Sequence, residues 1–206
     1  MTPTTIRRDT TERHVAKYSN PNPLHRLSLN RFHAALASEL HALAPTSILD
    51  FGCGEAFTLD QLAGHGVDIS NYEGVDLRAE ALDAARARWP GLRFSWADIL
   101  DSEFDGRRYD VTMALEVMEH LYEPEPILKR LVGLTEKALV LSVPHEPWFQ
   151  LMNLARGRDF IRLGNHPEHV QHWNSQTFAD FISPYAEVVG IRRSFPFIIA
   201  TARPRR

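Results

Sequence analysis

The sequence predicts an α/β fold: a seven-stranded, mostly parallel sheet with helices on both faces and an antiparallel hairpin at its C-terminal end. Two observations lead to this prediction. Short apolar runs alternate with helical patterns between residues 47 and 144, which is typical of parallel strands joined by crossover helices. Two further apolar runs, 186–193 and 195–202, are separated by Ser194 alone, and so short a connection joins antiparallel strands.

The elements follow one another in a regular order. A helix is expected over residues 24–43, because leucine and phenylalanine recur there at helical spacing before Pro45. The predicted strands are 47–51, 72–77, 92–99, 109–115, 137–144, 186–193 and 195–202. Helical patterns lie between strands at 55–66, 78–89, 116–121 and 125–134. We expect one domain, divided into an N-terminal helical cap (1–45), a core (46–143), an insert (144–185) and the terminal hairpin (186–206).

Composition excludes several classes of protein. The 206 residues are 44% hydrophobic and 24% charged, which is typical of a soluble globular protein rather than a disordered one. The net charge of −3 argues against a general nucleic-acid binder. A single cysteine, Cys53, cannot form an internal disulfide or a cysteine-based zinc cluster. No apolar run is long enough to span a membrane and no secretory signal is recognisable, so we expect a cytoplasmic protein.

The segment ILDFGCGEAF predicts a ligand-binding turn. An apolar strand ends near Asp50, Gly52 and Gly54 allow a tight turn, and a helix follows. Glycine is favoured where a Cβ atom would collide with a ligand or where φ is positive. An ordinary strand-to-helix turn can carry the same pattern, so the turn alone does not identify the ligand.

Acidic residues follow the next two strands. Asp76 ends the second strand and Asp98 follows the third. Because parallel strands end at the same edge of a sheet, both carboxylates are expected there, the first to accept ribose hydroxyls and the second an adenine amino group. A carboxylate at a strand end supports no core. We therefore expect Asp76→Ala to weaken ligand binding far more than stability.

The same turn indicates which cofactor is bound. A dinucleotide loop would require glycine at position 57, where this chain has Phe57. Asp50 would also repel a diphosphate, whereas it suits a ligand with a cationic end. S-adenosylmethionine has such an end, with a sulfonium and an α-ammonium group.

The segments ILDFGCG, GVDL, ADIL and YDVTMALEVMEHL, within residues 47–143, resemble in order and spacing the motifs of class I S-adenosylmethionine-dependent methyltransferases, which have a Rossmann-like fold. Ala56 stands where the family often has glycine. The resemblance implies S-adenosylmethionine as cofactor and S-adenosylhomocysteine as product. It assigns Asp50, Gly52 and Gly54 to the methionine part, Asp76 to the ribose, Leu77 to the adenine face, Asp98 and Ile99 to the adenine edge, and Glu116 to the cofactor as well.

The segment EVMEHL leaves several functions open. On a helix, Glu116, Glu119 and His120 would share one face. These side chains could stabilise helix ends, supply a general base, or form part of a metal site. Related segments occur in ubiquinone-pathway O-methyltransferases and in small-RNA terminal 2′-O-methyltransferases. In the latter, two glutamates and two histidines hold magnesium, and His169 would complete that set here. A metal is possible but not expected, and its ligands stay unknown.

The insert is longer than a crossover helix requires and is rich in aromatic and histidine side chains. We expect a lid that contacts the acceptor through Trp148, His169, His172 and Trp173; a small satellite core is the alternative. His120 and His145 are the candidate general bases.

The predicted function is methyl transfer to an oxygen or nitrogen of a small molecule, with no nucleic acid or membrane as partner. Metal-dependent 2′-O-methylation of RNA ends is the main alternative. A NAD-dependent oxidoreductase and a non-catalytic cofactor-binding protein are two others. The sequence does not indicate the oligomeric state.

Overall fold

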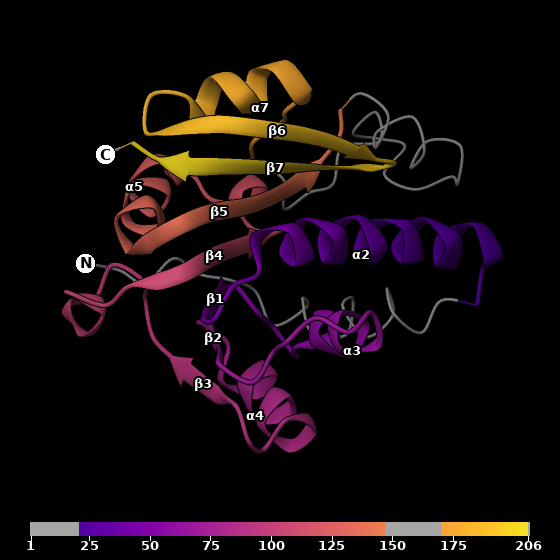
Figure 1. The fold of residues 1–206 in the computed structure, drawn as a ribbon, viewed down its shortest axis with the longest axis vertical. Coiled ribbons are helices and arrows are strands. Elements are labelled where there is room, and N and C mark those ends of the chain that lie inside the picture. Colours follow the sequence, from indigo (N-terminus) through magenta and orange to yellow (C-terminus); the bar gives the residue numbers. More distant parts are fainter. Residues whose placement is uncertain (1–20, 147–169, 206) are drawn as a thin grey trace.

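The computed structural model describes residues 21–146 and 170–205, which form one seven-stranded sheet with helices on both faces (Figure 1). The strands are β1 (Ile48–Phe51), β2 (Tyr72–Asp76), β3 (Arg93–Trp96), β4 (Tyr109–Leu115), β5 (Thr135–Pro144), β6 (Ala186–Ser194) and β7 (Phe197–Pro204). The helices are α2 (Pro23–Leu43), α3 (Phe57–Gly64), α4 (Ala79–Arg88), α5 (Pro124–Leu134) and α7 (Ser175–Ile182). Two short 3₁₀ turns are η1 (Ser102–Phe104) and η2 (Met118–His120).

The strand order is β3-β2-β1-β4-β5-β7-β6. The first five strands are parallel, so they all end at one side of the sheet, called the carboxyl edge below. Strand β7 runs antiparallel to both of its neighbours, β5 and β6. Residues Phe195 and Pro196 form the turn of the β6–β7 hairpin. The predicted fold class, including the C-terminal hairpin, is confirmed.

Helices α2, α3 and α4 cover one face of the sheet. Helix α2 begins where the Asn22 side chain accepts hydrogen bonds from the backbone N–H groups of Leu24 and His25, with Pro23 as its first residue. Its apolar side packs on the sheet, where the rings of Phe32 and Phe197 meet edge to face at 5.2 Å. The predicted N-terminal helix is therefore confirmed and fixed against the terminal hairpin.

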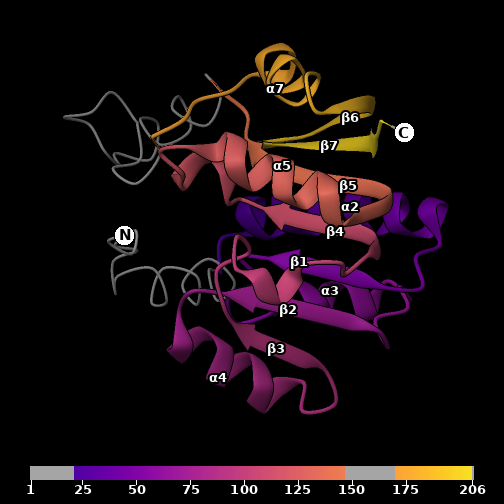
Figure 2. The same ribbon diagram turned by 90° about the vertical axis from the view of Figure 1, so that its left-hand side faces the viewer.

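Helices α5 and α7 cover the opposite face, as a comparison of Figures 1 and 2 shows. Helix α5 opens with Pro124 and buries Ile127, Leu128 and Leu131. Helix α7 opens with a capping box in which Asn174 and Thr177 satisfy each other's backbone N–H groups. Its buried side chains close the core over the hairpin.

Two predicted elements differ from the structure. The segment 116–121 is no α-helix, because Glu116 leaves β4 with a left-handed backbone (φ 58°) and a single 3₁₀ turn follows. The strand predicted at 92–99 ends at Trp96, so Asp98 lies in the loop that follows β3. Both differences place polar residues on loops at the carboxyl edge.

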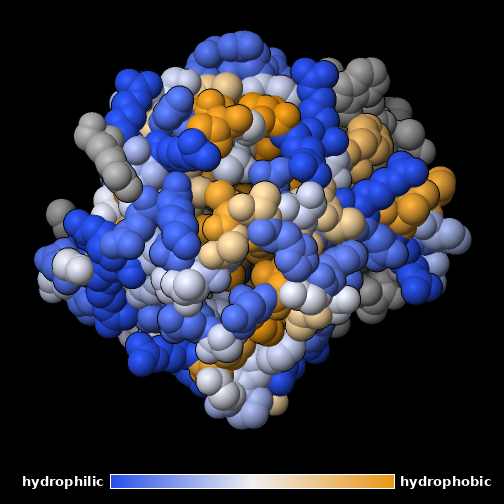
Figure 3. Space-filling model, in the orientation of Figure 1, coloured by the Kyte–Doolittle hydropathy of each residue, from blue (hydrophilic) through white to orange (hydrophobic). Residues whose placement is uncertain are grey.

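Charged and polar side chains cover most of the face shown in Figure 3, and apolar side chains surface between them in separate patches. Scattered exposed apolar residues are normal on soluble domains. Within the described ranges, no helix combines the length and apolar character needed to cross a membrane.

Candidate functional site

The centre of the carboxyl edge lies between β1 and β4, where the strand order reverses. Ligands of open α/β sheets bind at such switch points, because the two loops leave toward opposite faces and open a crevice. Here the loops touch: a Cβ atom on Gly52 would lie 2.5 Å from Val117 Cγ2. Gly52 also has φ +78°, so space and backbone both require glycine.

The glycine turn after β1 is fixed to the neighbouring strand β2. The backbone N–H groups of Gly52 and Cys53 donate to the Val75 carbonyl oxygen at 2.7 and 3.2 Å. Gly54 has φ 56°, and Ala56, buried at the start of α3, has φ 58°. For a residue with a Cβ atom, this left-handed backbone conformation is less favourable than a right-handed one by about 1 kcal/mol or more. Ala56 therefore adopts a conformation that glycine would adopt without that cost.

Asp76 joins the end of β2 to the glycine turn. Its Oδ2 accepts from the Gly54 backbone N–H at 2.9 Å and from Arg78 Nη2 at 3.1 Å. Its Oδ1 accepts from the backbone N–H and the Nε of Arg78, at 2.9 and 3.0 Å. Asp76 is only 4% exposed. These hydrogen bonds indicate that Asp76 also contributes to stability, because its removal would take four accepted hydrogen bonds from the turn and from half-buried Arg78. The comparison of binding with stability in Asp76→Ala stays a prediction.

Glu55 lies on the same turn and is buried. Arg78 Nη1 is 3.8 Å from Glu55 Oε1, so the guanidinium lies between two carboxylates. These neighbours, with the hydrogen bonds to Asp76, raise the pKa of Arg78 against the opposing effect of burial. The cationic side chain of Arg78 is therefore held between two carboxylates at the carboxyl edge.

Asp50 is buried beneath the glycine turn. The hydroxyl of Tyr72 donates to its Oδ2 at 2.7 Å. Burial raises the pKa of Asp50 to about 7, although the Tyr72 hydrogen bond opposes this rise. Near neutral pH the carboxyl group is thus divided between its two protonation states, and a nearby cation would favour the carboxylate.

The residues assigned to adenine lie in different environments. Leu77 is half-buried, and its carbonyl oxygen accepts from Trp96 Nε1 at 2.9 Å. Asp98 is half-buried in the loop after β3, where its Oδ1 accepts from the Leu100 N–H at 3.0 Å. Ile99 is fully buried in the core on the α5 side of the sheet. Leu77 and Asp98 are thus the more accessible of the three.

Glu116 is tied to the neighbouring strand β5. Its backbone N–H donates to the Ser142 carbonyl oxygen at 3.0 Å, and Ser142 Oγ donates to Glu116 Oε1 at 3.0 Å. Left-handed backbone at a residue other than glycine often marks a functional site. Glu116 therefore lies at the switch point with its side chain held by β5.

The predicted shared face of Glu116, Glu119 and His120 is wrong, because a left-handed residue and a 3₁₀ turn do not keep α-helical spacing. Glu119 is 1% exposed, and His120 is half-buried. The part of the chain that the structure describes has no cluster of three or more histidine, cysteine or acidic side chains suited to a metal ion. His169, the proposed fourth ligand, lies outside the described residues.

Of the insert, the structure describes residues 144–146 and 170–185, so Trp148, like His169, lies outside the described residues. Trp173 is 8% exposed and packs against Phe178 and Phe181, with ring centroids 5.4 and 5.2 Å away. It belongs to the core of this face, which agrees with the satellite-core alternative. His172 is exposed.

His145 directly follows β5 and is half-buried. Its backbone N–H donates to the Pro196 carbonyl oxygen at 2.8 Å, which joins the carboxyl edge to the hairpin turn. Burial, and then the charge of Arg193, lower the pKa of His145 below 6.5. The imidazole is therefore mainly neutral at pH 7 and can accept a proton.

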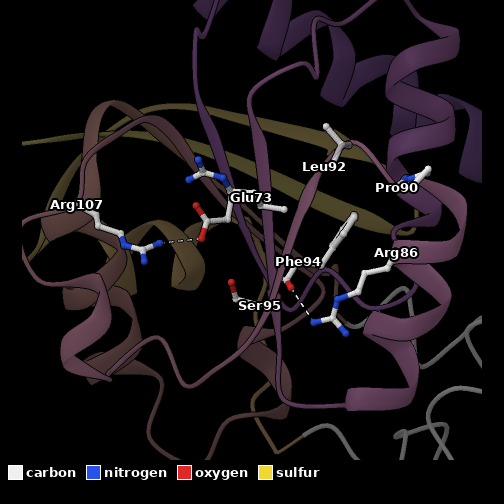
Figure 4. Close-up of a pocket in the computed structure, with 8 residues that line it drawn as sticks. Glu73, Arg86, Pro90, Leu92, Phe94, Ser95 and Arg107 are labelled. Atoms are coloured by element: carbon white, nitrogen blue, oxygen red, sulfur yellow. Dashed lines mark hydrogen bonds and ion pairs between the residues drawn. The ribbon is translucent and has the colours of Figure 1, made fainter.

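A separate pocket of about 570 Å³ lies beside the edge strand β3 (Figure 4). Its polar lining includes Glu73, Arg86 and Arg107, and Arg107 Nη1 is paired with Glu73 Oε1 at 2.9 Å. The predicted site residues are not among those that line it. Arg107 precedes β4 and Arg93 begins β3, so this pocket lies toward the opposite edge from the glycine turn.

Sequence reasoning missed four polar residues of the site: Glu55, Tyr72, Arg78 and Ser142. Arg78 stands two positions after Asp76, and this spacing allows a fork-like ion pair at a strand end. The other three depend on contacts between segments far apart in sequence, for which the residue pattern gives no signal.

The chain is similar to known methyltransferases. A family model described as a methyltransferase domain matches residues 24–183. A ubiquinone biosynthesis O-methyltransferase from Glaesserella parasuis is 27% identical over 130 residues, which are 59% of this chain and 53% of that protein. The chain spans about half of that relative, and 38% of the Coxiella burnetii protein of the same name.

Two solved structures share the fold over nearly the whole chain. Magnesium protoporphyrin IX methyltransferase from Synechocystis PCC 6803, crystallised with S-adenosylhomocysteine (SAH), has a TM-score of 0.68 at 16% identity, over 95% of this chain and 94% of that one. The plantazolicin methyltransferase, crystallised with a monoazolic desmethyl analogue and SAH, has a TM-score of 0.71 at 14% identity, over 96% and 90%.

Proposed function

Because this chain belongs to the family of methyltransferase domains that its residues 24–183 match, we propose that it transfers a methyl group from S-adenosylmethionine to an oxygen or nitrogen of a small molecule. The observation that carries the proposal is the hydrogen bond from the Gly54 N–H to Asp76, which holds the glycine turn against the end of β2 beside the switch point. This is where a nucleoside cofactor binds an open α/β sheet.

The residues at this edge fit the cofactor chemically. Four carboxyl side chains, Asp50, Glu55, Asp76 and Glu116, lie on the loops and strand ends, and they suit a ligand with a sulfonium and an ammonium group. We assign the methionine part to the turn from Gly52 to Gly54, the ribose to Asp76, and the adenine to Leu77 and Asp98. When bound, the sulfonium supplies an activated methyl group, so the protein mainly aligns the reactants and excludes water.

A hydroxyl acceptor needs a base, and we propose His145 for this role. It lies at the carboxyl edge, and its lowered pKa keeps the imidazole neutral at pH 7. His120 is the second candidate, since η2 places it beside the switch point. We also propose that His172 and Trp173 contact the acceptor.

The similar proteins reported above support the proposal of a small-molecule acceptor. They act in ubiquinone biosynthesis or on magnesium protoporphyrin IX and plantazolicin, and these acceptors differ from one another. The alternative of RNA-end methylation needs His169 as a fourth ligand, and this residue lies outside the described part of the chain, so the acceptor assay below tests this alternative. We therefore propose a small molecule as the acceptor.

Calorimetry tests the cofactor assignment. The chain should bind SAH and not NAD, and Asp76→Asn should weaken the binding, because one oxygen can no longer accept a ribose hydroxyl. Asp180→Asn, an exposed change on α7, is the matched control for the loss of one negative charge. A folded wild-type chain that binds NAD but not SAH would refute the proposal.

Turnover of labelled S-adenosylmethionine tests the acceptor class. Small hydroxylated and amino acceptors are compared with short RNAs, each with and without a chelator. We expect small acceptors to be methylated in both conditions. Methylation confined to RNA and dependent on magnesium or manganese would contradict the proposed acceptor.

A further inference from the structure

The carboxylate of Asp76 has no room for additional donors. A carboxylate offers about four lone-pair sites. The backbone N–H of Gly54 and the backbone N–H, Nε and Nη2 of Arg78 supply four donors, at 2.9–3.1 Å. A ribose that donates two hydroxyl groups to Asp76 must therefore replace two of them.

The two backbone donors cannot leave easily. Gly54 belongs to the turn that is fixed to Val75, and the backbone N–H of Arg78 lies only two residues beyond Asp76. The Nε and Nη2 atoms, in contrast, belong to a side chain that can rotate. They also supply two donors, the number that a ribose diol offers.

We infer that the Arg78 guanidinium and the cofactor ribose compete for the same acceptor sites on Asp76, and that cofactor binding transfers Arg78 to Glu55. This inference rests on the proposed function. Arg78 is thus a positioning residue: it holds Asp76 and the glycine turn together in the free enzyme and gives up Asp76 to the ribose.

Glu55 is the natural receiver for the displaced guanidinium. Its Oε1 is already 3.8 Å from Arg78 Nη1, and a shift of about 1 Å would make a charge-assisted hydrogen bond. Glu55 is also 2% exposed, so the transfer keeps the cation beside a buried carboxylate. A buried guanidinium left with no partner would be strongly unfavourable.

The competition predicts that Arg78 lowers the affinity for the cofactor. Arg78→Met keeps most of the aliphatic stem and removes the donors, and it should tighten SAH binding by about tenfold, since two charge-assisted bonds no longer need to be broken. Arg78→Lys keeps a cation that cannot form the fork, and it should give an intermediate affinity. Arg86→Met, on α4 away from the turn, is the matched control and should leave the affinity unchanged.

A double-mutant cycle tests the receiver. Glu55→Gln should weaken SAH binding in the wild-type background and have little effect in the Arg78→Met background, because the residue that needs the receiver is then absent. The 2′-deoxy analogue of SAH should gain less from Arg78→Met than SAH does. Together these measurements report the exchange of partners independently of turnover.

The outcomes separate the two proposals. Tighter binding in Arg78→Met, with coupling to Glu55, supports the inference. Unchanged or weaker binding in folded Arg78→Met overturns it while the proposed function stands, provided that the wild type binds SAH. A wild type that does not bind SAH overturns both. If Arg78→Met does not fold, Arg78→Lys decides: an affinity equal to or below that of the wild type overturns the inference.

Discussion

Replacing Asp50 with asparagine should stabilise the protein, and the gain should depend on pH. Burial raises the pKa of Asp50 from 3.8 to about 7. The native state therefore keeps a proton that the unfolded chain releases between about pH 4 and pH 7. At about 1.4 kcal/mol per pKa unit, the free energy of unfolding falls by as much as about 4 kcal/mol across this window and stays lowered above pH 7.

Asparagine carries no charge at any of these pH values, and its oxygen can still accept the hydrogen bond from Tyr72. Urea unfolding of Asp50→Asn and the wild type at pH 4, 5, 6, 7 and 8 measures the difference. We expect the free energies of unfolding of the two proteins to be almost equal at pH 4. The difference in favour of Asp50→Asn should grow toward pH 7 and level off above it at no more than about 4 kcal/mol. The exposed change Asp180→Asn should show no such rise. A flat difference between pH 4 and pH 8 would refute the reasoning.

Three further predictions follow from backbone geometry and from the candidate base. Gly52→Ala should cost at least about 1 kcal/mol more stability than Gly106→Ala, since both have strongly positive φ but only the former meets a side chain; equal losses in urea unfolding would contradict the clash. Ala56→Gly should raise the free energy of unfolding by up to about 1 kcal/mol, whereas Ala84→Gly inside α4 should lower it by about as much. The rate of methyl transfer should fall below pH 6.5 as His145 takes up a proton, and His145→Gln should remove this acidic limb; a limb that persists would exclude His145 as the base.

The local patterns in the sequence were sufficient to predict the fold class and the order of the strands along the chain. Alternating apolar runs, helical spacing and turn residues lie close together along the chain, and each of the seven strands was expected near its observed place. The tight hairpin was recognisable for the same reason. The family match likewise confirms the predicted S-adenosylmethionine-dependent methyltransferase at the level of the family.

The environment of the site was less predictable, because it depends on contacts between distant segments. Glu116 adopts a left-handed backbone where β4 meets Ser142 of β5, and helical spacing in EVMEHL could not reveal that. A buried aromatic such as Trp173 has the same sequence pattern as one that contacts an acceptor. The Arg78 side chain donates two hydrogen bonds to Asp76 because of the direction in which it points, and the sequence does not show that direction. The individual roles of the cofactor residues stay predictions.

The place of β7 has a consequence for the newly made chain. Strand β7 fills the gap between β5 and β6, and it pairs Phe197 with Pro144 and Ala202 with Leu139. While a ribosome is still synthesising the residues between these partners, one edge of β5 has unpaired N–H and C=O groups that can pair with another chain. Pairing across so long a stretch of sequence is also slow. The nascent protein is therefore exposed to pairing with other chains after β5 emerges and before β7 can dock.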